Sequence, residues 1–212
     1  MKLYGYWRSS AAYRVRIALH LKQIAFNSVP VHLIKDGGEQ HSSAYDELNP
    51  AHLVPTLVDE EFTLHQSLAI IDYLEHKCPL PSVYPSNPQE RAIVSALAFD
   101  IACEVHPINN LRVQQYLVNE LSASDEQKSA WVNDWISKGF SAFERQLQKY
   151  AGEFCFGNAV TLADICLVPQ VYNAKRFNVD MSPYPMIQRV TNRCNELDAF
   201  IAALPENQED AL

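Results

Sequence analysis

The stretch RSSAAYRVRIAL, Arg8–Leu19, follows directly on the strand-like run KLYGYW, residues 2–7. One side of this stretch carries apolar residues at helical spacing, and the other side is polar, so the sequence predicts that a strand passes straight into an amphipathic helix. Either Ser9 or Ser10 can be the N-cap of this helix. The same position also favours an anion, because free N–H groups and the positive end of the helix dipole meet there. The apolar side holds Ala11, Val15, Ala18 and Leu19, and the polar side holds Arg14, Arg16 and His20.

The composition is that of a soluble globular protein, with 48% hydrophobic and 20% charged residues among 212. The net charge of -8 argues against nucleic acid as a partner, because few basic residues are available to neutralise phosphates. We find neither a secretory signal nor a membrane span and expect a cytoplasmic protein. The five cysteines form no zinc-like cluster, and we expect them to be reduced and mostly buried. They are Cys78, Cys103, Cys155, Cys166 and Cys194.

Strands and helices alternate up to about residue 78, in the predicted order β-α-β-α-β-β-α. The first helix connects two strands, so these strands should be parallel, and the closely spaced third and fourth strands should form an antiparallel hairpin. The predicted elements after the first helix are FNSVPVHL (26–33), SAYDEL (43–48), PTLVD (55–59), FTL (62–64) and SLAIIDYLEHKC (67–78).

The proline-rich stretch PLPSVYPSNP, residues 79–88, stops the preceding helix and reads as a linker. We therefore predict a mixed α/β domain over residues 1–79, a linker over 80–87 and an all-helical domain over 88–212. Thr161 and Asp164 form a capping box at the start of one of the helices. The predicted long helices cover residues 89–119, 124–150 and 162–177, and one or two short helices end near Leu204.

Several of these stretches together resemble the zeta class of glutathione transferases, from Leu3 to about Leu204. The resemblance implies a thioredoxin-like domain followed by a helical-bundle domain, and a homodimer. It also implies an enzyme that isomerises maleylacetoacetate to fumarylacetoacetate, in tyrosine and phenylalanine catabolism, with glutathione regenerated in each turnover. The stretches are RSSAAYRVRIAL, NPAHLVPTL, HQSLAIIDYL, HPINNLRV and LADICLVPQVYNAKRF.

By this resemblance, glutathione lies mainly on the first domain. A cis peptide before Pro55 would expose the backbone of Val54 to the cysteinyl part of glutathione. Gln66 and Ser67 would hold its γ-glutamyl carboxylate, and the N-terminus of the helix that Ser67 begins also favours an anion. The remaining residues implied to bind glutathione are Ser9, Ser10, Gln40, His106, Asn110, Leu111 and Arg112, of which the last four would lie on the first long helix of the second domain.

The family motif usually reads Ser-Ser-Cys, whereas the third residue here is Ala11. A role that needs a protein thiol at this point is therefore excluded. Ser9 matches the catalytic serine of the family, and Ser10 remains an alternative. A serine hydroxyl and the helix N-terminus would stabilise the glutathione thiolate, which adds to the double bond, allows rotation and is eliminated.

The expected substrate is a small dicarboxylic keto acid, which calls for cations near the sulfur. Arg8, Arg14 and Arg176 match arginines that the family uses for this task, and guanidinium suits bidentate carboxylate binding. His106 could assist proton transfer or be an ordinary helix residue. The histidines lack metal-ligand spacing, so we expect no metal.

Other functions remain open at this stage. A related enzyme could conjugate or dehalogenate α-halo acids or isomerise maleylpyruvate, since a fold does not determine the acceptor. A catalytically silent glutathione-binding protein is a further alternative, for which Ala11 is the only hint. A thiol-disulfide oxidoreductase is disfavoured, because the strand–helix junction has no cysteine.

Overall fold

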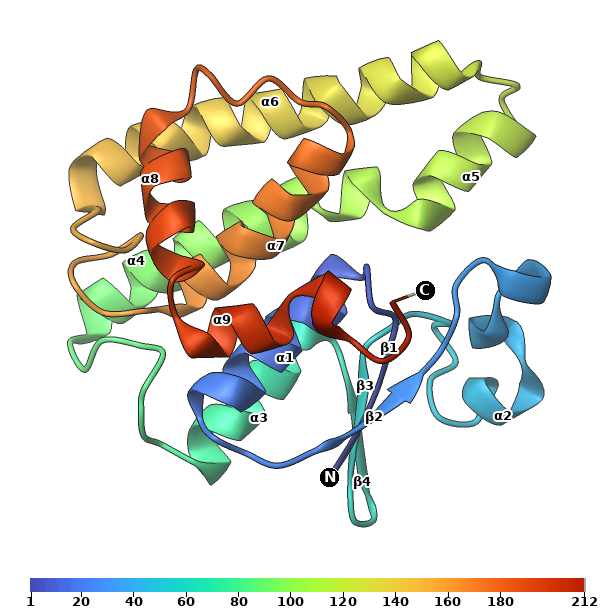
Figure 1. Cartoon of the computed structure of the whole chain (residues 1–212), viewed down its shortest axis with the longest axis horizontal. Helices are drawn as coiled ribbons and strands as arrows, with labels where there is room; N and C mark the ends of the chain where they lie inside the picture. The colour runs from blue at the N-terminus through green and yellow to red at the C-terminus, as the bar shows by residue number, and fades with distance from the viewer. Residues whose placement is uncertain (212) are drawn as a thin grey trace. The chain divides into compact units, whose positions relative to one another are not determined.

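The structure is a computed structural model that describes residues 1–211, and its contacts divide the chain into two compact units (Figure 1). The first unit contains Met1–Ser82 and the segment that starts at Glu196, and the second contains Val83–Asn195. The segment after Glu196 was predicted to belong to the helical domain. It groups with the first unit because helix α9 (Asp198–Ala203) packs on helix α1 (Ser10–Leu21). We describe each unit separately.

The first unit has the predicted thioredoxin-like order of elements around a four-stranded sheet. The strands lie in the order β2-β1-β3-β4. β1 and β2 are parallel, and β3 is antiparallel to both β1 and β4, which confirms the predicted parallel pair and hairpin. The elements are β1 (Lys2–Gly5), α1, β2 (Asn27–Pro30), the 3-10 turns η1 (Lys35–Gly37) and η2 (Glu39–His41), α2 (Ser43–Asp46), β3 (Thr56–Asp59), β4 (Phe62–His65), α3 (Ser67–Lys77), α9, and the 3-10 turn η5 (Pro205–Asn207).

Helix α1 is buried on more sides than its amphipathic pattern predicted. Arg14 and Arg16, expected on a polar side, are only 2% and 3% exposed, so that expectation is wrong for both. Their guanidinium groups have polar partners: Arg14 Nη1 donates to Ser67 Oγ at 3.4 Å, and Arg16 Nε donates to the carbonyl of Ala203 at 3.1 Å. Each of these hydrogen bonds lowers the free-energy cost of burying the charge.

The second unit is helical, but its first long helix is not continuous. The predicted helix 89–119 is divided into α4 (Pro88–Phe99), a π-helical turn η3 (Asp100–Val105), a 3-10 turn η4 (Pro107–Asn109) and α5 (Leu111–Asn119). Asn110 is extended, with φ -65° and ψ 152°, and caps α5. Pro107 lacks the N–H needed to continue the helix, which explains the break. The remaining helices are α6 (Asp125–Tyr150), α7 (Leu162–Arg176) and α8 (Pro185–Cys194).

The run Pro88–Asn119 is apolar as well as long. By length and composition alone it could cross a membrane, whereas from the sequence we expected no membrane span. A single run of this kind is weak evidence, because the core helix of a soluble protein passes the same test. In this unit α4 packs against α7.

The predicted capping box at the start of α7 is confirmed. Asp164 is fully buried and its carboxylate accepts from Thr161 N–H and Oγ1, at 2.8 and 2.9 Å, and from Cys155 N–H at 2.8 Å. Burial raises the pKa of Asp164, and the hydrogen bonds from Cys155 and Thr161 oppose that rise. All five cysteines are free and three are buried, including Cys155, as expected.

Replacement of this carboxylate should destabilise the protein. We expect Asp164→Ala to lower the free energy of unfolding by about 3 kcal/mol, because it leaves buried donors without an acceptor. Urea denaturation followed by circular dichroism measures this, with Glu120→Ala as the control, since Glu120 is an exposed carboxylate. Equal stability of the two variants would show that the buried hydrogen bonds contribute little.

Candidate active site

Ser9 lies in the short connection between strand β1 and helix α1. Its Oγ accepts from the N–H of Ala12 at 3.2 Å, and its own N–H donates to the carbonyl of Tyr6 at 2.9 Å. Ser9 is partly exposed, whereas Ser10, the first residue of the helix, is buried. Of the two serines, Ser9 is therefore the N-cap. Because its oxygen acts as an acceptor toward the helix, its hydroxyl hydrogen can be donated to an anion placed before the helix.

Arg14 and Ser67 meet at the start of α3. The hydrogen bond between Arg14 Nη1 and Ser67 Oγ joins two residues that the sequence predicted for different ligands, Arg14 for the substrate and Ser67 for glutathione. The first turn of α3 carries no acidic residue. A guanidinium beside a helix N-terminus favours a carboxylate at this point.

Gln66 precedes α3 in an unusual conformation. Its φ of 73° lies in the left-handed region, which a residue other than glycine adopts only when the surrounding structure imposes it. The side chain of Gln66 is exposed, so it can contact a ligand bound at the start of α3. Strained residues of this kind are concentrated at ligand sites.

Val54 presents free backbone groups, as the resemblance implied. The Val54–Pro55 peptide is cis. Within residues 1–211, neither the N–H nor the C=O of Val54 makes a hydrogen bond. The backbone of a peptide ligand can therefore pair with this residue in the manner of an added strand.

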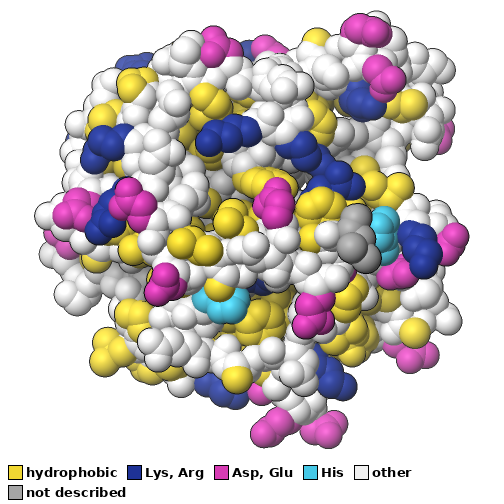
Figure 2. Space-filling model, viewed as in Figure 1, with side chains coloured by type: hydrophobic (Ala, Val, Ile, Leu, Met, Phe, Trp, Pro, Cys, Tyr) yellow, Lys and Arg dark blue, Asp and Glu magenta, His cyan; other side chains and the backbone are white. Residues whose placement is uncertain are grey.

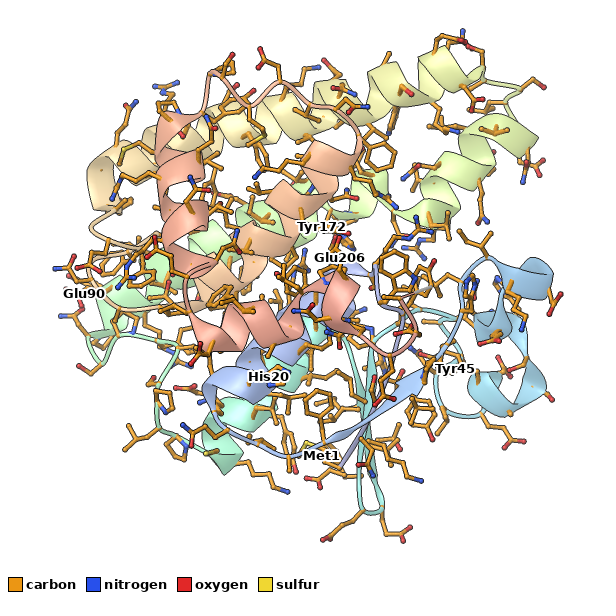
Figure 3. All side chains as sticks on the ribbon, viewed as in Figure 1. Met1, His20, Tyr45, Glu90, Tyr172 and Glu206 are labelled. Atoms are coloured by element: carbon orange, nitrogen blue, oxygen red, sulfur yellow. The ribbon has the colours of Figure 1, made fainter. Side chains whose placement is uncertain are left out.

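The segment before Val54 is held by a buried polar network that sequence analysis missed. The carbonyl of Leu53 accepts from Tyr45 Oη at 2.7 Å and from Asn49 Nδ2 at 2.8 Å, and both donors also contact Thr56 Oγ1. Burial raises the pKa of Tyr45, which keeps the phenol protonated as a donor. Figure 3 labels Tyr45 beside the sheet. Sequence patterns could not reveal that Tyr45 and Asn49 hold the Leu53 carbonyl, because these contacts depend on the path of the loop between α2 and β3.

Gln40 is buried in the loop before α2. Its Nε2 donates to the carbonyl of Leu33 at 3.4 Å, and among the described residues its buried Oε1 has no hydrogen-bond partner. Gly38 makes this position possible. A Cβ on Gly38 would lie 2.4 Å from Gln40 Nε2, and the φ of Gly38, 104°, is left-handed. A buried unpaired acceptor calls for a donor from a ligand or a water.

The guanidinium of Arg8 contacts the aromatic rings of the two preceding residues, Tyr6 and Trp7. Its Nη2 donates to Tyr6 Oη at 2.9 Å, and its guanidinium carbon is 4.7 Å from the centre of the Trp7 ring. Stacking on an indole orients a guanidinium while its remaining donors keep their in-plane directions. Arg8 is partly exposed, as a carboxylate ligand would require.

The second unit carries the other predicted site residues, and they are not on one helix as expected. His106 lies between η3 and η4, Asn110 is the N-cap of α5, and Leu111 and Arg112 form the first turn of α5. The side chain of Asn110 accepts from Arg112 N–H at 3.2 Å. This use of Asn110 as a cap gives its amide a structural role.

Arg176 is the last residue of α7 and is exposed. Its Nη2 donates to Asn173 Oδ1 at 3.3 Å, and its guanidinium carbon is 4.6 Å from the centre of the Phe177 ring. Helix α6 holds both parts of this unit that carry predicted site residues. Near His106, Trp131 Nε1 donates to the carbonyl of Ile108, and next to Arg176, Asn133 Nδ2 donates to the carbonyl of Phe177. Neither anchoring residue was identified from the sequence.

Glutathione fits the first unit by the chemistry of the residues present. Val54 offers both backbone groups to a peptide, the N-terminus of α3 with Arg14 suits a carboxylate, and the unpaired Oε1 of Gln40 suits an N–H donor. These are the groups that a tripeptide with free carboxylates requires. We find no group of three or more His, Cys, Asp or Glu residues suited to a metal within residues 1–211.

Comparisons with known proteins agree with this chemistry. The family models for the N-terminal and C-terminal domains of glutathione S-transferase match residues 3–82 and 111–206. A probable maleylacetoacetate isomerase from Vibrio cholerae is 55% identical over 209 residues, which cover 99% of this chain and 97% of that protein.

Solved structures are similar over the whole chain. A maleylpyruvate isomerase, described as a bacterial zeta-class glutathione S-transferase in its holo form, has a TM-score of 0.97 at 44% identity, with all of both chains covered. A maleylacetoacetate isomerase from Methylobacterium extorquens, with bound malonate and glutathione, has a TM-score of 0.96 at 37% identity, again over all of both chains.

The role of Gln40 can be tested by substitutions at Gly38 and at its neighbour Gly37. In Gly38→Ala the new methyl group displaces Gln40, and we expect the Kd for glutathione to rise about ten-fold, the effect of losing about 1 to 1.5 kcal/mol of hydrogen bonding. Gly37→Ala is the control, because Gly37 also has a positive φ, 85°, but nothing lies within 4 Å of its added Cβ. Calorimetry measures both. An equal change in the two variants would contradict a role for Gln40.

Proposed function

Because the chain belongs to the glutathione S-transferase family, we propose that it is a glutathione-dependent isomerase that converts maleylacetoacetate to fumarylacetoacetate. This reaction is a step in tyrosine and phenylalanine degradation. The position of the Ser9 hydroxyl carries the proposal: it caps α1 in a chain that matches maleylacetoacetate isomerases over nearly its whole length.

Each site residue has a proposed role. Bound glutathione supplies a thiolate that can add to the cis double bond and leave again after rotation. Ser9 donates its hydroxyl hydrogen to that sulfur, with Ser10 as the alternative donor, and the dipole of α1 adds a partial positive charge. Arg8 and Arg176 bind the carboxylates of the acid substrate. Arg14 matches a substrate-binding arginine by resemblance, whereas its contact with Ser67 favours the γ-glutamyl carboxylate.

The remaining residues bind glutathione in this proposal. Val54 pairs with the cysteinyl backbone, Gln66 and Ser67 hold the γ-glutamyl carboxylate, and Gln40 Oε1 accepts from an N–H of glutathione. In the second unit, the residues proposed to contact glutathione are those that the resemblance implies, namely His106, Asn110, Leu111 and Arg112.

We also propose that the enzyme is a cytoplasmic homodimer that binds neither nucleic acid nor membranes. Family membership supports the dimer, and free, mostly buried cysteines fit a reducing compartment. On the face shown in Figure 2, Lys and Arg side chains occur singly or in small groups between acidic and apolar ones, unlike the basic stripe of a nucleic-acid-binding surface.

Maleylpyruvate is the second candidate substrate. The solved structure with the TM-score of 0.97 is named a maleylpyruvate isomerase, and a 45% identical relative from a Ralstonia species has the same name. Both substrates are cis-enoic keto acids with two carboxylates, so the same residues can serve either.

Isomerisation assays test the proposal. We expect rapid cis-to-trans conversion of maleylacetone or maleylacetoacetate that requires glutathione and leaves its total concentration unchanged. A faster rate with maleylpyruvate would favour the second candidate. Consumption of glutathione with α-halo acids, without isomerisation, would indicate a conjugating transferase, and glutathione binding without turnover would indicate a silent binding protein.

The role of the Ser9 hydroxyl can be separated from its role as a cap. Glycine is nearly as good an N-cap as serine, so Ser9→Gly should cost only a few tenths of a kcal/mol in stability. We expect its kcat/KM to fall about 100-fold, the effect of removing one donor from a developing or resident anion. The absorbance of bound thiolate at different pH values should show a raised thiol pKa. A similar loss in Ser10→Ala but not in Ser9→Gly would transfer the role to Ser10.

A further inference from the structure

The peptide groups of Trp7 are held from far along the chain. Trp7 N–H donates to the Asp210 carboxylate at 3.0 Å, and the carbonyl of Trp7 accepts from Arg16 Nη2 at 2.9 Å. The same Arg16 side chain donates to the carbonyl of Ala203. The segment that follows Glu196 is therefore linked to Trp7 twice, directly through Asp210 and indirectly through Arg16. Both bonds to Trp7 involve a charged side chain, and such hydrogen bonds are the stronger class.

Asp210 belongs to an ordered turn. The side-chain amide of Gln208 donates to the carbonyls of Ala202, at 3.1 Å, and Leu204, at 2.7 Å, and Ala211 N–H donates back to the carbonyl of Gln208. Phe200, Ala203 and Pro205 are buried within this segment. Figure 3 labels Glu206 in the turn that follows α9. The Asp210 carboxylate is therefore fixed relative to α9, which in turn packs on α1.

Trp7 lies at the centre of the connection between β1 and α1. This connection consists of the residues from Tyr6 to Ser9, and its internal hydrogen bond runs from Ser9 N–H to the carbonyl of Tyr6. That bond closes the turn but does not hold the Trp7 peptide. The Trp7 ring supports the guanidinium of Arg8 at 4.7 Å. A rotation of the Trp7 peptide would therefore move the ring and the arginine together.

We propose that Asp210 is a positioning residue for Arg8: its carboxylate fixes the Trp7 peptide, and the Trp7 ring then holds the Arg8 guanidinium where it binds a carboxylate of the acid substrate. This inference rests on the proposed function for the role of Arg8. Glutathione binding by Val54, Gln66 and Ser67 does not pass through Trp7, and the Ser9 N–H bond to the Tyr6 carbonyl bypasses the Trp7 peptide. Asp210 should therefore affect the affinity for the acid substrate much more than the affinity for glutathione.

The test compares three full-length variants. Asp210→Ala removes the acceptor, whereas Asp210→Asn keeps an oxygen that can accept from Trp7 N–H and serves as the conservative rescue. Glu209→Ala is the matched control, because it removes the same charge from the adjacent, exposed residue. The measurements are kcat and KM for maleylacetone, the Kd for glutathione, the Kd for malonate in the presence of glutathione, and hydrogen exchange of peptides that contain the Trp7 amide.

In Asp210→Ala we expect KM for maleylacetone and Kd for malonate to rise about five- to ten-fold, faster exchange at Trp7, and a change of less than about two-fold in the Kd for glutathione. Asp210→Asn should recover most of the affinity, and Glu209→Ala should resemble the wild type. Equal loss of affinity for glutathione and malonate, with a lowered melting temperature, would show a general structural role and overturn the proposal. Values for Asp210→Ala that match those for Glu209→Ala would also overturn it.

The two proposals can fail separately. If the wild-type protein does not isomerise maleylacetone, the proposed function fails, while malonate binding and Trp7 exchange still decide whether Asp210 positions Arg8. If the wild type isomerises maleylacetone and Asp210→Ala retains wild-type KM and exchange, only the positioning proposal fails.

Discussion

The free N–H groups in the first turn of α1 impose the constraint on which the first unit depends. The chain passes from β1 to α1 within the residues Tyr6–Ser9, so these donors need an acceptor from a very short connection. Ser9 supplies it with its side chain and bonds its own N–H to Tyr6. Ser9 thus closes the turn, caps the helix and presents a hydroxyl at the positive end of the helix dipole.

The surroundings of this junction are held by hydrogen bonds between buried polar groups. Asn49 and Tyr45 fix the carbonyl of Leu53, and Arg14 meets Ser67 at the start of α3. The bonds to Leu53 close a local loop, whereas the bond from Arg14 to Ser67 joins residues 53 positions apart. Each leaves a neighbouring group available: the backbone of Val54 in one case, the helix N-terminus in the other. The core of this unit and its proposed glutathione site therefore share the same hydrogen bonds.

Local patterns predicted most elements of the fold, because strands and helices of the first unit follow hydrophobic periodicity and turn signals. The parallel pairing of β1 and β2, the hairpin and the Thr161–Asp164 cap were all read correctly. Arg14 and Arg16 were misread, since periodicity treats every arginine as polar and cannot show a buried acceptor such as the carbonyl of Ala203. The break at Asn110 has a sequence signal in Pro107, which lacks the N–H that a continuous helix needs.

The candidate site was predicted through a resemblance more than through physics. Ser9 and Ser10 were singled out from the strand–helix junction itself. The resemblance identified Ser67 and the cis peptide before Pro55, and it named Gln40 without showing that its amide oxygen is buried and, among the described residues, unpaired. Residues that act through others escaped: Asn49, Trp131 and Asn133 carry no local signal of their function. Their partners are set by tertiary structure, which one sequence without an alignment does not reveal.

The grouping of the final segment with the first unit has a consequence for synthesis on the ribosome. Translation proceeds from the N-terminus, and domains generally fold as they emerge. Here α9, which packs on α1, is made only after the whole second unit, Val83–Asn195. The surface of α1 that contacts α9, including the Arg16 guanidinium, stays uncovered until the whole second unit has been translated. The first unit therefore reaches its final form only after the second unit and α9 have been translated, and the nascent protein must tolerate an exposed face for that interval.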